Sequence, residues 1–307
     1  MDWLSAHKKN TDDVFADAER LLRSFPEPLN QLGLAYFAKF DLRQEESTKN
    51  YICYLLPYWM KEITSLPDES VNKLSLANVF VMLYYFVIDD IMDSAGGEHR
   101  DKLPLANLFQ LQFQSTYREL FPSQSPFWHY HEAYVLEWAD AVAGESHADY
   151  FHTEVRKVAW KASPVKNAST GALLLANQAE RIPVVTEAVE QVLVTLQMLD
   201  DWADWEEDWE EGSYNCLLAF LRRNGLSLES GSLTPDWVKQ QVYVHDELDL
   251  YADVAASHHE KLLGLEIAMN ELFLFHLSLV DSLRKTANEI KEKRRTLLSG
   301  GLYYFLS

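Results

Sequence analysis

Residues 67–93 read PDESVNKLSLANVFVMLYYFVIDDIMD, and this stretch decides the fold class. Pro67 followed by two acidic residues and a serine indicates a helix start, because proline and negative charge both suit the first turn of a helix. An apolar run follows, and three carboxylates close it at Asp89, Asp90 and Asp93. The stretch therefore predicts one long apolar helix that begins near residue 68 and ends at Asp93.

Helical periodicity recurs along most of the chain, and proline or glycine interrupts it. The 307 residues include only 11 Gly and 10 Pro, too few turn residues for a sandwich or barrel of many short strands. No internal repeat is visible that would indicate a solenoid. We predict an all-α fold, a single domain over residues 1–307 built as a bundle of ten or more helices.

The same punctuation predicts where individual helices begin and end. Thr11 and the two aspartates after it can cap a first helix that stops before Pro26, and Gly212 should end the helix that Pro183 opens. A serine-rich stretch at 224–235 is the clearest loop. The other predicted helices run toward Phe40 and cover about 48–65, 68–93, 102–121, 125–147, 148–162, 236–255 and 256–297.

Composition and charge exclude several classes of partner. Hydrophobic residues make up 48% and charged residues 24%, the balance of a folded globular protein. Lys and Arg number 27 against 47 Asp and Glu, so the formal net charge is −20. Phosphate backbones and anionic membranes attract basic proteins, so we expect neither as a partner. The longest apolar stretch, at about 74–88, is shorter than the ~20 residues of a membrane-spanning helix.

Cysteine content and the N-terminal residues bear on the compartment. Two cysteines, Cys53 and Cys216, cannot form a disulfide framework, which favours a reduced protein. The first ten residues, MDWLSAHKKN, lack the apolar segment of a signal peptide. We therefore expect a cytoplasmic protein without a membrane span.

The carboxylates at the end of the long helix form the first candidate site. In an α-helix Asp89 and Asp93 lie on one face, with Asp90 on its flank. Like charges one turn apart, at the negative end of the helix dipole, are unfavourable by about 0.2–1 kcal/mol. A solvated helix end would suit Lys or Arg better, whereas carboxylate oxygens are the ligands that hard divalent cations take. An exposed helix end is the alternative interpretation.

A second acidic segment, QMLDDWADWEEDWEEG, covers residues 197–212. Asp200, Asp204 and Asp208 recur every four residues, which forms a carboxylate stripe over two helical turns, and Asp201 lies beside its start. An apolar register precedes the stripe, so the stripe should begin near the core and emerge toward solvent. The alternative, a solvated acidic face, fits the four glutamates of the segment better than Asp200 and Asp201.

Two carboxylate sets of this kind could act together on one ligand. If their helices are antiparallel, the two sets can face each other and hold a diphosphate between them through Mg²⁺. The cations would neutralise the ligand's charge, orient the leaving group and stabilise the departing diphosphate. Without metal, the carboxylates would repel a diphosphate.

On these two segments the sequence resembles the class I isoprenoid synthase superfamily, which comprises trans-prenyl diphosphate synthases, squalene and phytoene synthases, and class I terpene cyclases. The resemblance implies a helical bundle around a central apolar cavity, with an aspartate-rich motif on each of two facing helices. It implies three Mg²⁺ ions, with Mn²⁺ as a substitute. The implied metal ligands are Asp89, Asp90, Asp93, Asp200, Asp201, Asp204 and Asp208, and all of them except Asp201 are also implied to be catalytic.

The second segment resembles the motifs of three subfamilies. Gln197, three residues before an Asp-Asp pair, is similar to the second motif of chain-elongating synthases. Terpene cyclases have ligands at the positions of Asp200, Asp204 and Asp208, and a glycine at the position of Gly212. Here Asp204 replaces their hydroxyl ligand and Asp208 their glutamate, and both replacements can still bind a metal. Phytoene-type synthases have a related pattern that this segment also fits.

The resemblance further implies basic and aromatic side chains that hold the diphosphate. Trp160-Lys161 is the first choice because the family places a diphosphate-sensing cation in this region, and Arg156 is close behind. Residues near the C-terminus resemble the closure region of cyclases. Each cation taken singly also fits an ordinary surface position. The full implied set is Arg156, Lys157, Lys161, Arg294, Arg295 and Tyr303.

Four residues are expected to line the substrate pocket: Tyr85, Phe86, Gly171 and Gln197. Phe86 lies one turn before the first motif, and a ring facing a carbocation contributes about 0.5–2 kcal/mol. Gly171 follows Ala-Ser-Thr in a small-residue stretch, where the family has a broken helix whose carbonyls face the cation. Close packing between helices is the alternative reason for a glycine there.

The expected function is a Mg²⁺-dependent class I terpene synthase that ionises a linear C15–C25 allylic prenyl diphosphate and releases diphosphate. A homodimer is the assembly that the resemblance implies. Elongating synthases usually carry a GKxxR-type motif and an Arg pair after the first motif; this chain has neither, which favours one diphosphate substrate and cyclisation. The alternatives are a prenyl-coupling enzyme, by head-to-head synthesis or chain elongation, and a helical partner subunit without catalysis.

Overall fold

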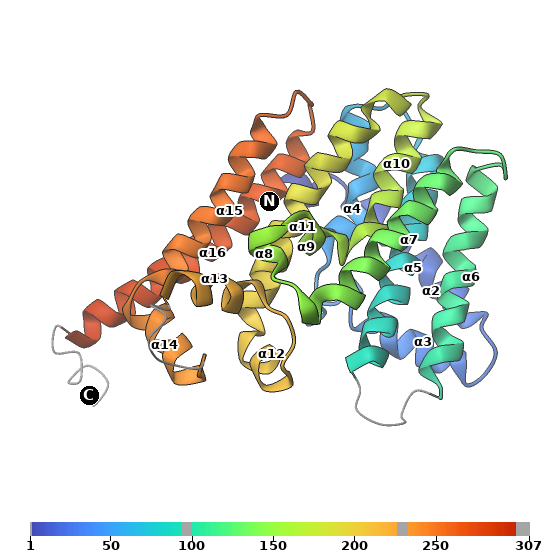
Figure 1. Cartoon of the computed structure of the whole chain (residues 1–307). Coiled ribbons are helices and arrows are strands. Elements are labelled where there is room, and N and C mark those ends of the chain that lie inside the picture. Colours follow the sequence, from blue (N-terminus) through green and yellow to red (C-terminus); the bar gives the residue numbers. More distant parts are fainter. Residues whose placement is uncertain (1, 94–99, 226–232, 299–307) are drawn as a thin grey trace. The chain divides into compact units, whose positions relative to one another are not determined.

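The structure is a computed structural model that describes residues 2–93, 100–225 and 233–298. Over these ranges the chain forms sixteen α-helices, four short 3₁₀ helices and no β-strand (Figure 1). The prediction of an all-α fold with ten or more helices is therefore confirmed. The chain divides into two compact units, each assembled from three stretches of sequence. The single domain over residues 1–307 and the central apolar cavity stay predictions.

Unit 1 comprises residues 1–135, 164–186 and 267–272. Its main helices are α1 (Asp2–Ser5), α2 (Lys8–Arg23), α3 (Leu29–Ala38), α4 (Tyr51–Trp59), α5 (Asp68–Asp93), α6 (Lys102–Leu120), the first part of α7 (Phe127–Gly144) and α10 (Lys166–Leu175).

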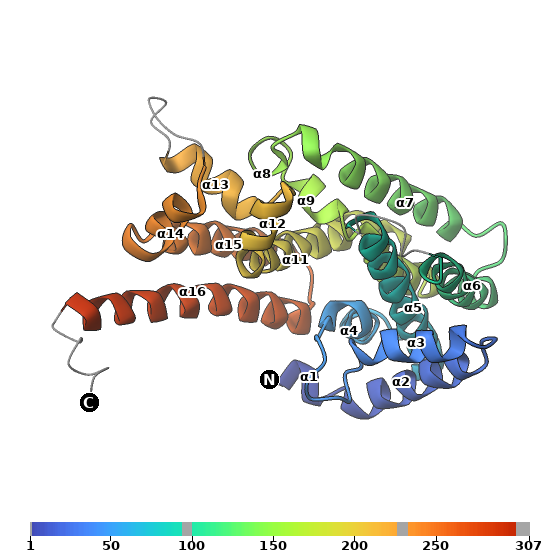
Figure 2. The ribbon, with the colours of Figure 1, turned by 90° about the horizontal axis from the view of Figure 1, so that it is seen from below.

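The core of unit 1 is built around α5. This helix packs against α6, α4, α2 and α10, and α2 and α3 lie side by side (Figure 2). Apolar side chains along α5, such as Val79, Phe80 and Leu83, are fully buried. The bounds of α5 agree with the sequence prediction because two acidic residues occupy its first turn, where the helix dipole favours them.

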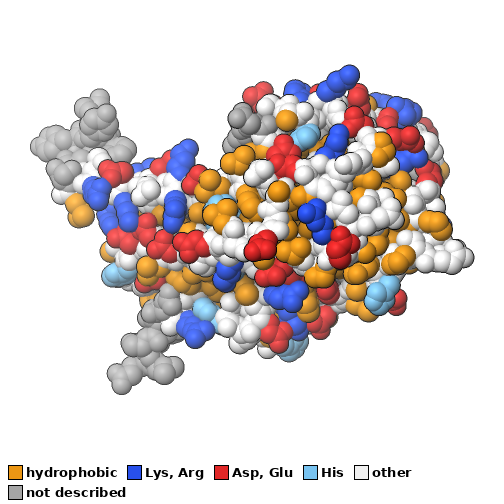
Figure 3. All heavy atoms as spheres, turned by 90° about the horizontal axis from the view of Figure 1, so that it is seen from above, with side chains coloured by type: hydrophobic (Ala, Val, Ile, Leu, Met, Phe, Trp, Pro, Cys, Tyr) orange, Lys and Arg blue, Asp and Glu red, His pale blue; other side chains and the backbone are white. Residues whose placement is uncertain are grey.

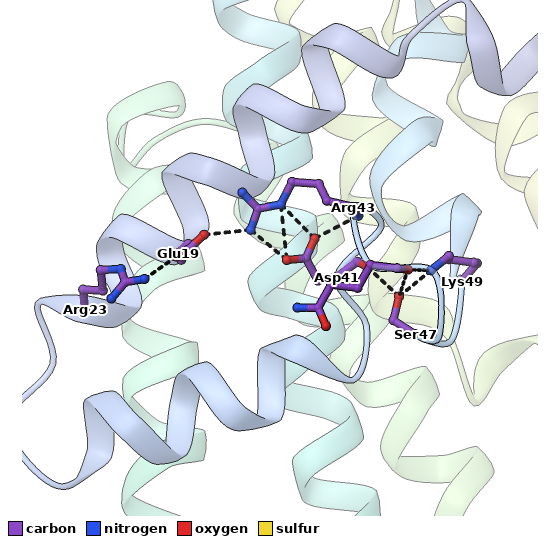
Figure 4. Close-up of polar contacts among 7 residues, drawn as sticks. Glu19, Arg23, Asp41, Arg43, Ser47 and Lys49 are labelled. Atoms are coloured by element: carbon purple, nitrogen blue, oxygen red, sulfur yellow. Dashed lines mark hydrogen bonds and ion pairs between the residues drawn. The ribbon is translucent and has the colours of Figure 1, made fainter.

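An ion-pair network holds the segment that joins α3 to α4 (Figure 4). The Arg43 Nη2 atom lies 2.8 Å from Glu19 Oε2 of α2 and 2.7 Å from Asp41 Oδ2. Asp41 is only 3% exposed, whereas the Arg43 side chain that pairs with it keeps access to solvent. In the same segment Lys49 donates to the Ser47 hydroxyl. These contacts tie the connection to α2 and so set where α4 begins.

Unit 2 comprises residues 136–163, 187–266 and 273–307. Its helices are the second part of α7, α8 (Tyr150–Thr153), α9 (Arg156–Trp160), most of α11 (Ile182–Ala203), α12 (Trp205–Glu211), α13 (Cys216–Gly225), α14 (Pro235–Val244), α15 (Glu247–Leu263) and most of α16 (Asn270–Leu298).

Buried histidines connect α11, α15 and α16 within unit 2. His276 Nε2 lies 2.8 Å from the Thr195 hydroxyl, and its Nδ1 lies 2.9 Å from Nδ1 of His259. His258 Nδ1 lies 2.7 Å from the side-chain oxygen of Gln191. Burial lowers the pKa of His258 to about 4 and that of His276 to about 3, so both rings are neutral at pH 7.

Some predicted helix boundaries in the N-terminal part were wrong. The first long helix, α2, begins at Lys8, so Thr11 lies inside the helix and not at its cap. Its hydroxyl donates to the Lys8 carbonyl within the same turn. The predicted helix at 148–162 is two short helices, α8 and α9, because the chain leaves helical geometry at Glu154.

Boundaries also differ in the C-terminal part. The predicted junction between residues 255 and 256 lies in the middle of α15; the actual turn is at 245–246, where Asp246 has a φ of 61°. The predicted helix at 183–211 is interrupted at Asp204, which separates α11 from α12. Gly212 ends α12 with a φ of 77°, a conformation that favours glycine, so this predicted end is confirmed.

Two helical segments, Asp68–Asp93 and Ala179–Ala203, are long and apolar enough to cross a membrane by length and composition. In each, 56% of the most apolar window is buried inside the protein. Such burial is typical of a core helix in a folded protein. The absence of a membrane span stays a prediction.

The surface carries both signs of charge. On the face drawn in Figure 3, acidic and basic side chains are interspersed with exposed hydrophobic ones. Several charged residues of the protein form helical ion pairs four residues apart, such as Lys8 with Asp12 at 3.0 Å. Pairs of this kind are solvated and contribute about 0–1 kcal/mol each.

Candidate functional site

The first carboxylate set lies at the C-terminal end of α5 in unit 1. Asp89 and Asp93 are exposed and Asp90 is half-buried. The last turn of α5 contains no basic residue that would balance the helix dipole. Lys102, the first residue of α6, supplies the nearby positive charge, with Nζ 3.4 Å from Asp90 Oδ2 and 3.4 Å from the Asp90 carbonyl oxygen.

Aromatic residues surround this set within unit 1. Tyr36 of α3 is only 8% exposed. Burial raises the pKa of its hydroxyl, and the charges of Asp90 and then Asp89 raise it further. Phe86, one turn before Asp90, packs on Phe40 with ring centroids 5.0 Å apart. Aromatic side chains therefore pack next to the first set, while the carboxylates of Asp89 and Asp93 are exposed to solvent.

The second carboxylate set lies in unit 2, where α11 gives way to α12. Asp201 is 3% exposed, and both of its oxygens accept hydrogen bonds. Gln197 Nε2 donates to Oδ1 at 2.6 Å, and the backbone N–H of Cys216 donates to Oδ2 at 2.6 Å. Asp201 therefore holds the beginning of α13 against α11. Of the four aspartates in the second set, Asp201 is the one whose two side-chain oxygens are both shown to accept hydrogen bonds within the protein.

Asn215 completes the connection between these helices. Its side-chain nitrogen donates to the Asp201 carbonyl and to Asp208 Oδ2, both at 2.7 Å. Its side-chain oxygen accepts from the backbone N–H of Leu218 at 3.0 Å, which caps α13. Asn215 thus fixes the orientation of the Asp208 carboxylate relative to α11.

The two outer carboxylates of this set hold their protons more tightly than ordinary aspartates. Burial among neighbouring protein atoms raises the pKa of Asp200 to about 6, and the charges of Asp201 and Asp204 add to the effect, although the Asp200 side chain keeps access to solvent. Burial also raises the pKa of Asp208 to about 6, against the opposing hydrogen bond from Asn215. Crowded carboxylates that gain from a nearby positive charge are suited to bind a cation.

Lys161 is the cation that acts on this set. It follows α9, and its Nζ lies 2.8 Å from Glu145 Oε2 at the end of α7. Its positive charge lowers the pKa of both Asp200 and Asp208, opposing the effect of burial. Lys161 is 24% exposed in its side chain, so a ligand at the carboxylates can reach it.

The other predicted diphosphate-binding residues have other partners. Arg156 pairs with the buried Glu190 through Nη2 at 2.8 Å, and Lys157 pairs with Asp140 at 2.9 Å. Arg294 forms a bidentate pair with Asp246, in which both distances are 2.8 Å. Arg295 pairs with Glu292 on its own helix. Tyr303 lies outside the described residues.

Two of the predicted pocket residues have clear packing roles. Gly171 lies within the continuous helix α10, and a Cβ at this position would be 3.0 Å from Leu74 Cδ2 and 3.1 Å from Phe121 Cζ. Close helix packing is therefore the observed reason for this glycine, and α10 is unbroken there. Tyr85 is half-buried, with its ring 4.9 Å from that of Tyr84.

Several residues near the two sets were not anticipated from the sequence: Tyr36, Lys102, Glu145 and Asn215. Asn215 had a readable signal, because an asparagine directly before the apolar run Cys216–Leu221 is a typical helix cap. The other three carry no local signal. Their positions depend on which helices pack together.

The side chains of the second set are carboxylates, the kind of donor that Mg²⁺ takes. Over the ranges that the structure describes, no three acidic, histidine or cysteine side chains are arranged as ligands of a single ion. Mg²⁺ in phosphate-binding sites is commonly held by one or two carboxylates, with phosphate oxygens and water completing the shell. Asp200 and Asp204 are exposed and Asp208 is half-buried, so their oxygens can supply the protein's share.

Neither of the two surface hollows found within unit 2 opens at these carboxylates. One lies along the outer face of α16, and the other lies between α8, α13 and α15. No model of a known protein family matches the sequence, and a search of curated proteins found no significant match. The functional argument therefore depends on the residues described above.

Proposed function

We propose that the protein is a Mg²⁺-dependent class I terpene synthase that ionises a linear allylic prenyl diphosphate and releases diphosphate. One observation carries the proposal. Of the three aspartates of the carboxylate stripe in unit 2, Asp200 and Asp208 have pKa values of about 6, and the positive charge of Lys161 lowers the pKa of both. An exposed acidic face needs neither the raised pKa values nor a lysine that acts on them. A site for metal and diphosphate needs both signs of charge.

The proposal gives a role to each of the residues described at the second carboxylate set in unit 2. The carboxylates of Asp200, Asp204 and Asp208 bind cations that carry the diphosphate. Bound Mg²⁺ supplies positive charge that neutralises the diphosphate and favours its departure. Lys161 leaves Glu145 and donates to a diphosphate oxygen, while Asn215 holds Asp208 in place. Asp201 and Gln197 keep α13 against α11 and so maintain the arrangement.

The proposal also assigns metal binding to the carboxylates of Asp89, Asp90 and Asp93 in unit 1. Their support is the position at the end of an apolar helix without a basic last turn. Phe86, directly below them on α5, would present its ring to the cation that forms when the bond to diphosphate breaks. The product assay described next addresses the substrate length and the product. Size-exclusion chromatography of the purified protein addresses the assembly state.

The direct test offers one substrate at a time. Labelled geranyl, farnesyl, geranylgeranyl and geranylfarnesyl diphosphates are incubated with the purified protein and Mg²⁺, and products are identified by mass spectrometry. We expect a cyclised or dephosphorylated terpene from a single substrate, and its loss with a chelator. A product that forms only with added isopentenyl diphosphate, or from two prenyl units, would replace the proposal with prenyl coupling.

A binding experiment separates the enzyme from a catalytically inert helical subunit. Calorimetric titration of Mg²⁺ is carried out with and without inorganic diphosphate. The proposal predicts that diphosphate strengthens Mg²⁺ binding, because each ligand neutralises the other. Glu210→Gln, an exposed change on α12 outside the stripe, is the matched control and should bind like the wild type. Uncoupled weak binding would leave only a solvated acidic face.

A further inference from the structure

A second hollow of unit 2, away from the carboxylates, has the features of a binding site. It is an open hollow of about 380 Å³ between α8, α13 and α15. Its apolar wall includes Phe151 of α8, Phe220 of α13 and Val254 of α15. The two phenylalanine rings meet edge to face, with centroids 6.3 Å apart. Small-molecule sites enclose about 300–1,000 Å³, so this hollow suits a small ligand.

The charged side chains that line this hollow are basic over the part of the chain that the structure describes. Arg223 and Lys261 line it, and no described aspartate or glutamate does. Both side chains are exposed, and among the described residues neither forms an ion pair. Each lies in the last turn of its helix, where a cation is favourable, and this explains each cation singly. It does not explain why no described carboxylate shares the lining with them in a chain of net charge −20.

Neutral polar groups complete the lining. His152 Nε2 lies 3.2 Å from the carbonyl oxygen of Ala219, so this nitrogen donates a hydrogen bond to the backbone. His258 is held neutral by burial, and the charge of Lys261 lowers the pKa of His258 further. Lys261 follows His258 by three residues on α15, so both side chains belong to the same wall of the hollow.

We propose that this hollow binds a phosphate monoester whose ester group is small and apolar. The phosphoryl oxygens would lie against Arg223 and Lys261, because a dianion balances two cations whereas a carboxylate would balance one. The ester group would lie against Phe151 and Phe220, which a free inorganic phosphate would leave without a partner. This inference does not depend on the proposed terpene synthase activity.

The test uses phenyl phosphate and the full-length protein. Calorimetric titrations are run at low ionic strength with a chelator, so that no metal can carry the ligand to the carboxylate sets. We expect one phenyl phosphate per chain, bound at least 10-fold more tightly than inorganic phosphate. Added salt should weaken the binding, because it screens the two exposed cations.

Single glutamine substitutions locate the site. Arg223→Gln and Lys261→Gln should each weaken phenyl phosphate binding at least 10-fold. Arg222→Gln is the matched control, since Arg222 is the exposed neighbour that does not line the hollow, and it should bind as the wild type does. Circular dichroism and the urea midpoint verify that all three variants are folded; the changes are at exposed side chains.

Three results would overturn the inference. No binding of phenyl phosphate up to about 10 mM would remove the site. Equal affinity for inorganic phosphate would remove the ester from the proposal. Equal weakening by Arg222→Gln would show that general surface charge, and not the hollow, attracts the anion.

Discussion

Two long apolar helices of this protein end in the same pattern, Asp-Asp-x-x-Asp, and the two ends differ in their surroundings. At the end of α5, Asp90 is half-buried beside Lys102 and its two companions are exposed. At the end of α11, Asp201 is enclosed, and Asp200 has a pKa of about 6. The same five-residue pattern therefore has a different electrostatic character in each unit.

The difference originates in the helix that follows each set. After α11 the chain returns through Gly212 and places the beginning of α13 on Asp201, which removes that carboxylate from solvent. Residue Asn215 then fixes Asp208. At α5 the described neighbour is the first residue of α6, a lysine at 3.4 Å. The element packed against a carboxylate motif thus determines the pKa values of its side chains and how exposed they are.

The largest expected effect concerns turnover. Asp200→Asn and Asp89→Asn should each lower product formation on the order of 10²–10³-fold, because each removes charge stabilisation at the departing diphosphate. Product formation from the preferred prenyl diphosphate is measured in Mg²⁺, with Glu210→Gln as the control. If Asp89→Asn kept full activity while Asp200→Asn lost it, the chemistry would belong to unit 2 alone.

The next effect concerns the pH dependence of Mg²⁺ binding. A carboxyl must lose its proton to bind the ion, and the pKa values of Asp200 and Asp208 are about 6. Lowering the pH from 7 to 5 should therefore weaken Mg²⁺ binding in the presence of diphosphate, by about 10-fold for each carboxylate and about 100-fold for the two.

Calorimetry at a series of pH values measures this dependence. In Asp208→Asn the dependence should fall to that of one carboxylate. An affinity that does not change between pH 5 and 7 would mean that neither group binds the ion. The electrostatic difference between the two carboxylate sets would then have no bearing on metal binding.

A smaller effect concerns stability. Asp201→Ala leaves the buried N–H of Cys216 and the amide of Gln197 without their acceptor, and should lower the free energy of unfolding by about 1–3 kcal/mol. Asp93→Ala at the exposed end of α5 is the counterpart and should change it by less than about 0.5 kcal/mol. Urea unfolding measures both; equal losses would contradict the structural role of Asp201.

The smallest effect is expected at Lys102. Its contact with Asp90 is partly exposed, so Lys102→Ala should cost about 0–1 kcal/mol of stability and less at high salt. Urea unfolding at low and high ionic strength gives the value. A loss above 2 kcal/mol, independent of salt, would show that the first set is as enclosed as the second.

Much of the fold could be predicted from the sequence, and the limits are instructive. The bounds of α5 follow from Pro67, the acidic first turn and the apolar run, which are all local signals. The end of α12 follows from Gly212, which adopts a positive φ. The breaks at Glu154, Asp204 and His245 were missed, because no proline or glycine marks them.

The candidate site was predictable to a similar degree. The spacing of Asp200, Asp204 and Asp208 is a property of the sequence, as is the position of each carboxylate at the end of an apolar helix. Gly171 was assigned to the substrate pocket, whereas its contacts with Leu74 and Phe121 come from helices distant in sequence. Helical periodicity indicates that a residue faces inward, but it cannot indicate what it faces.

The sequence by itself determined that this chain is all-helical and that its acidic residues gather at two helix ends, since turn residues and side-chain periodicity act within a few residues. Only the tertiary structure decided that Asp201 is a structural residue, that Asp200 and Asp208 hold protons up to a pH of about 6, and that Lys161 is their cation. The reason is physical: a pKa depends on desolvation and on charges a few ångströms away. One of those neighbours, Lys161, lies 39 residues before Asp200 and 47 before Asp208 in the chain.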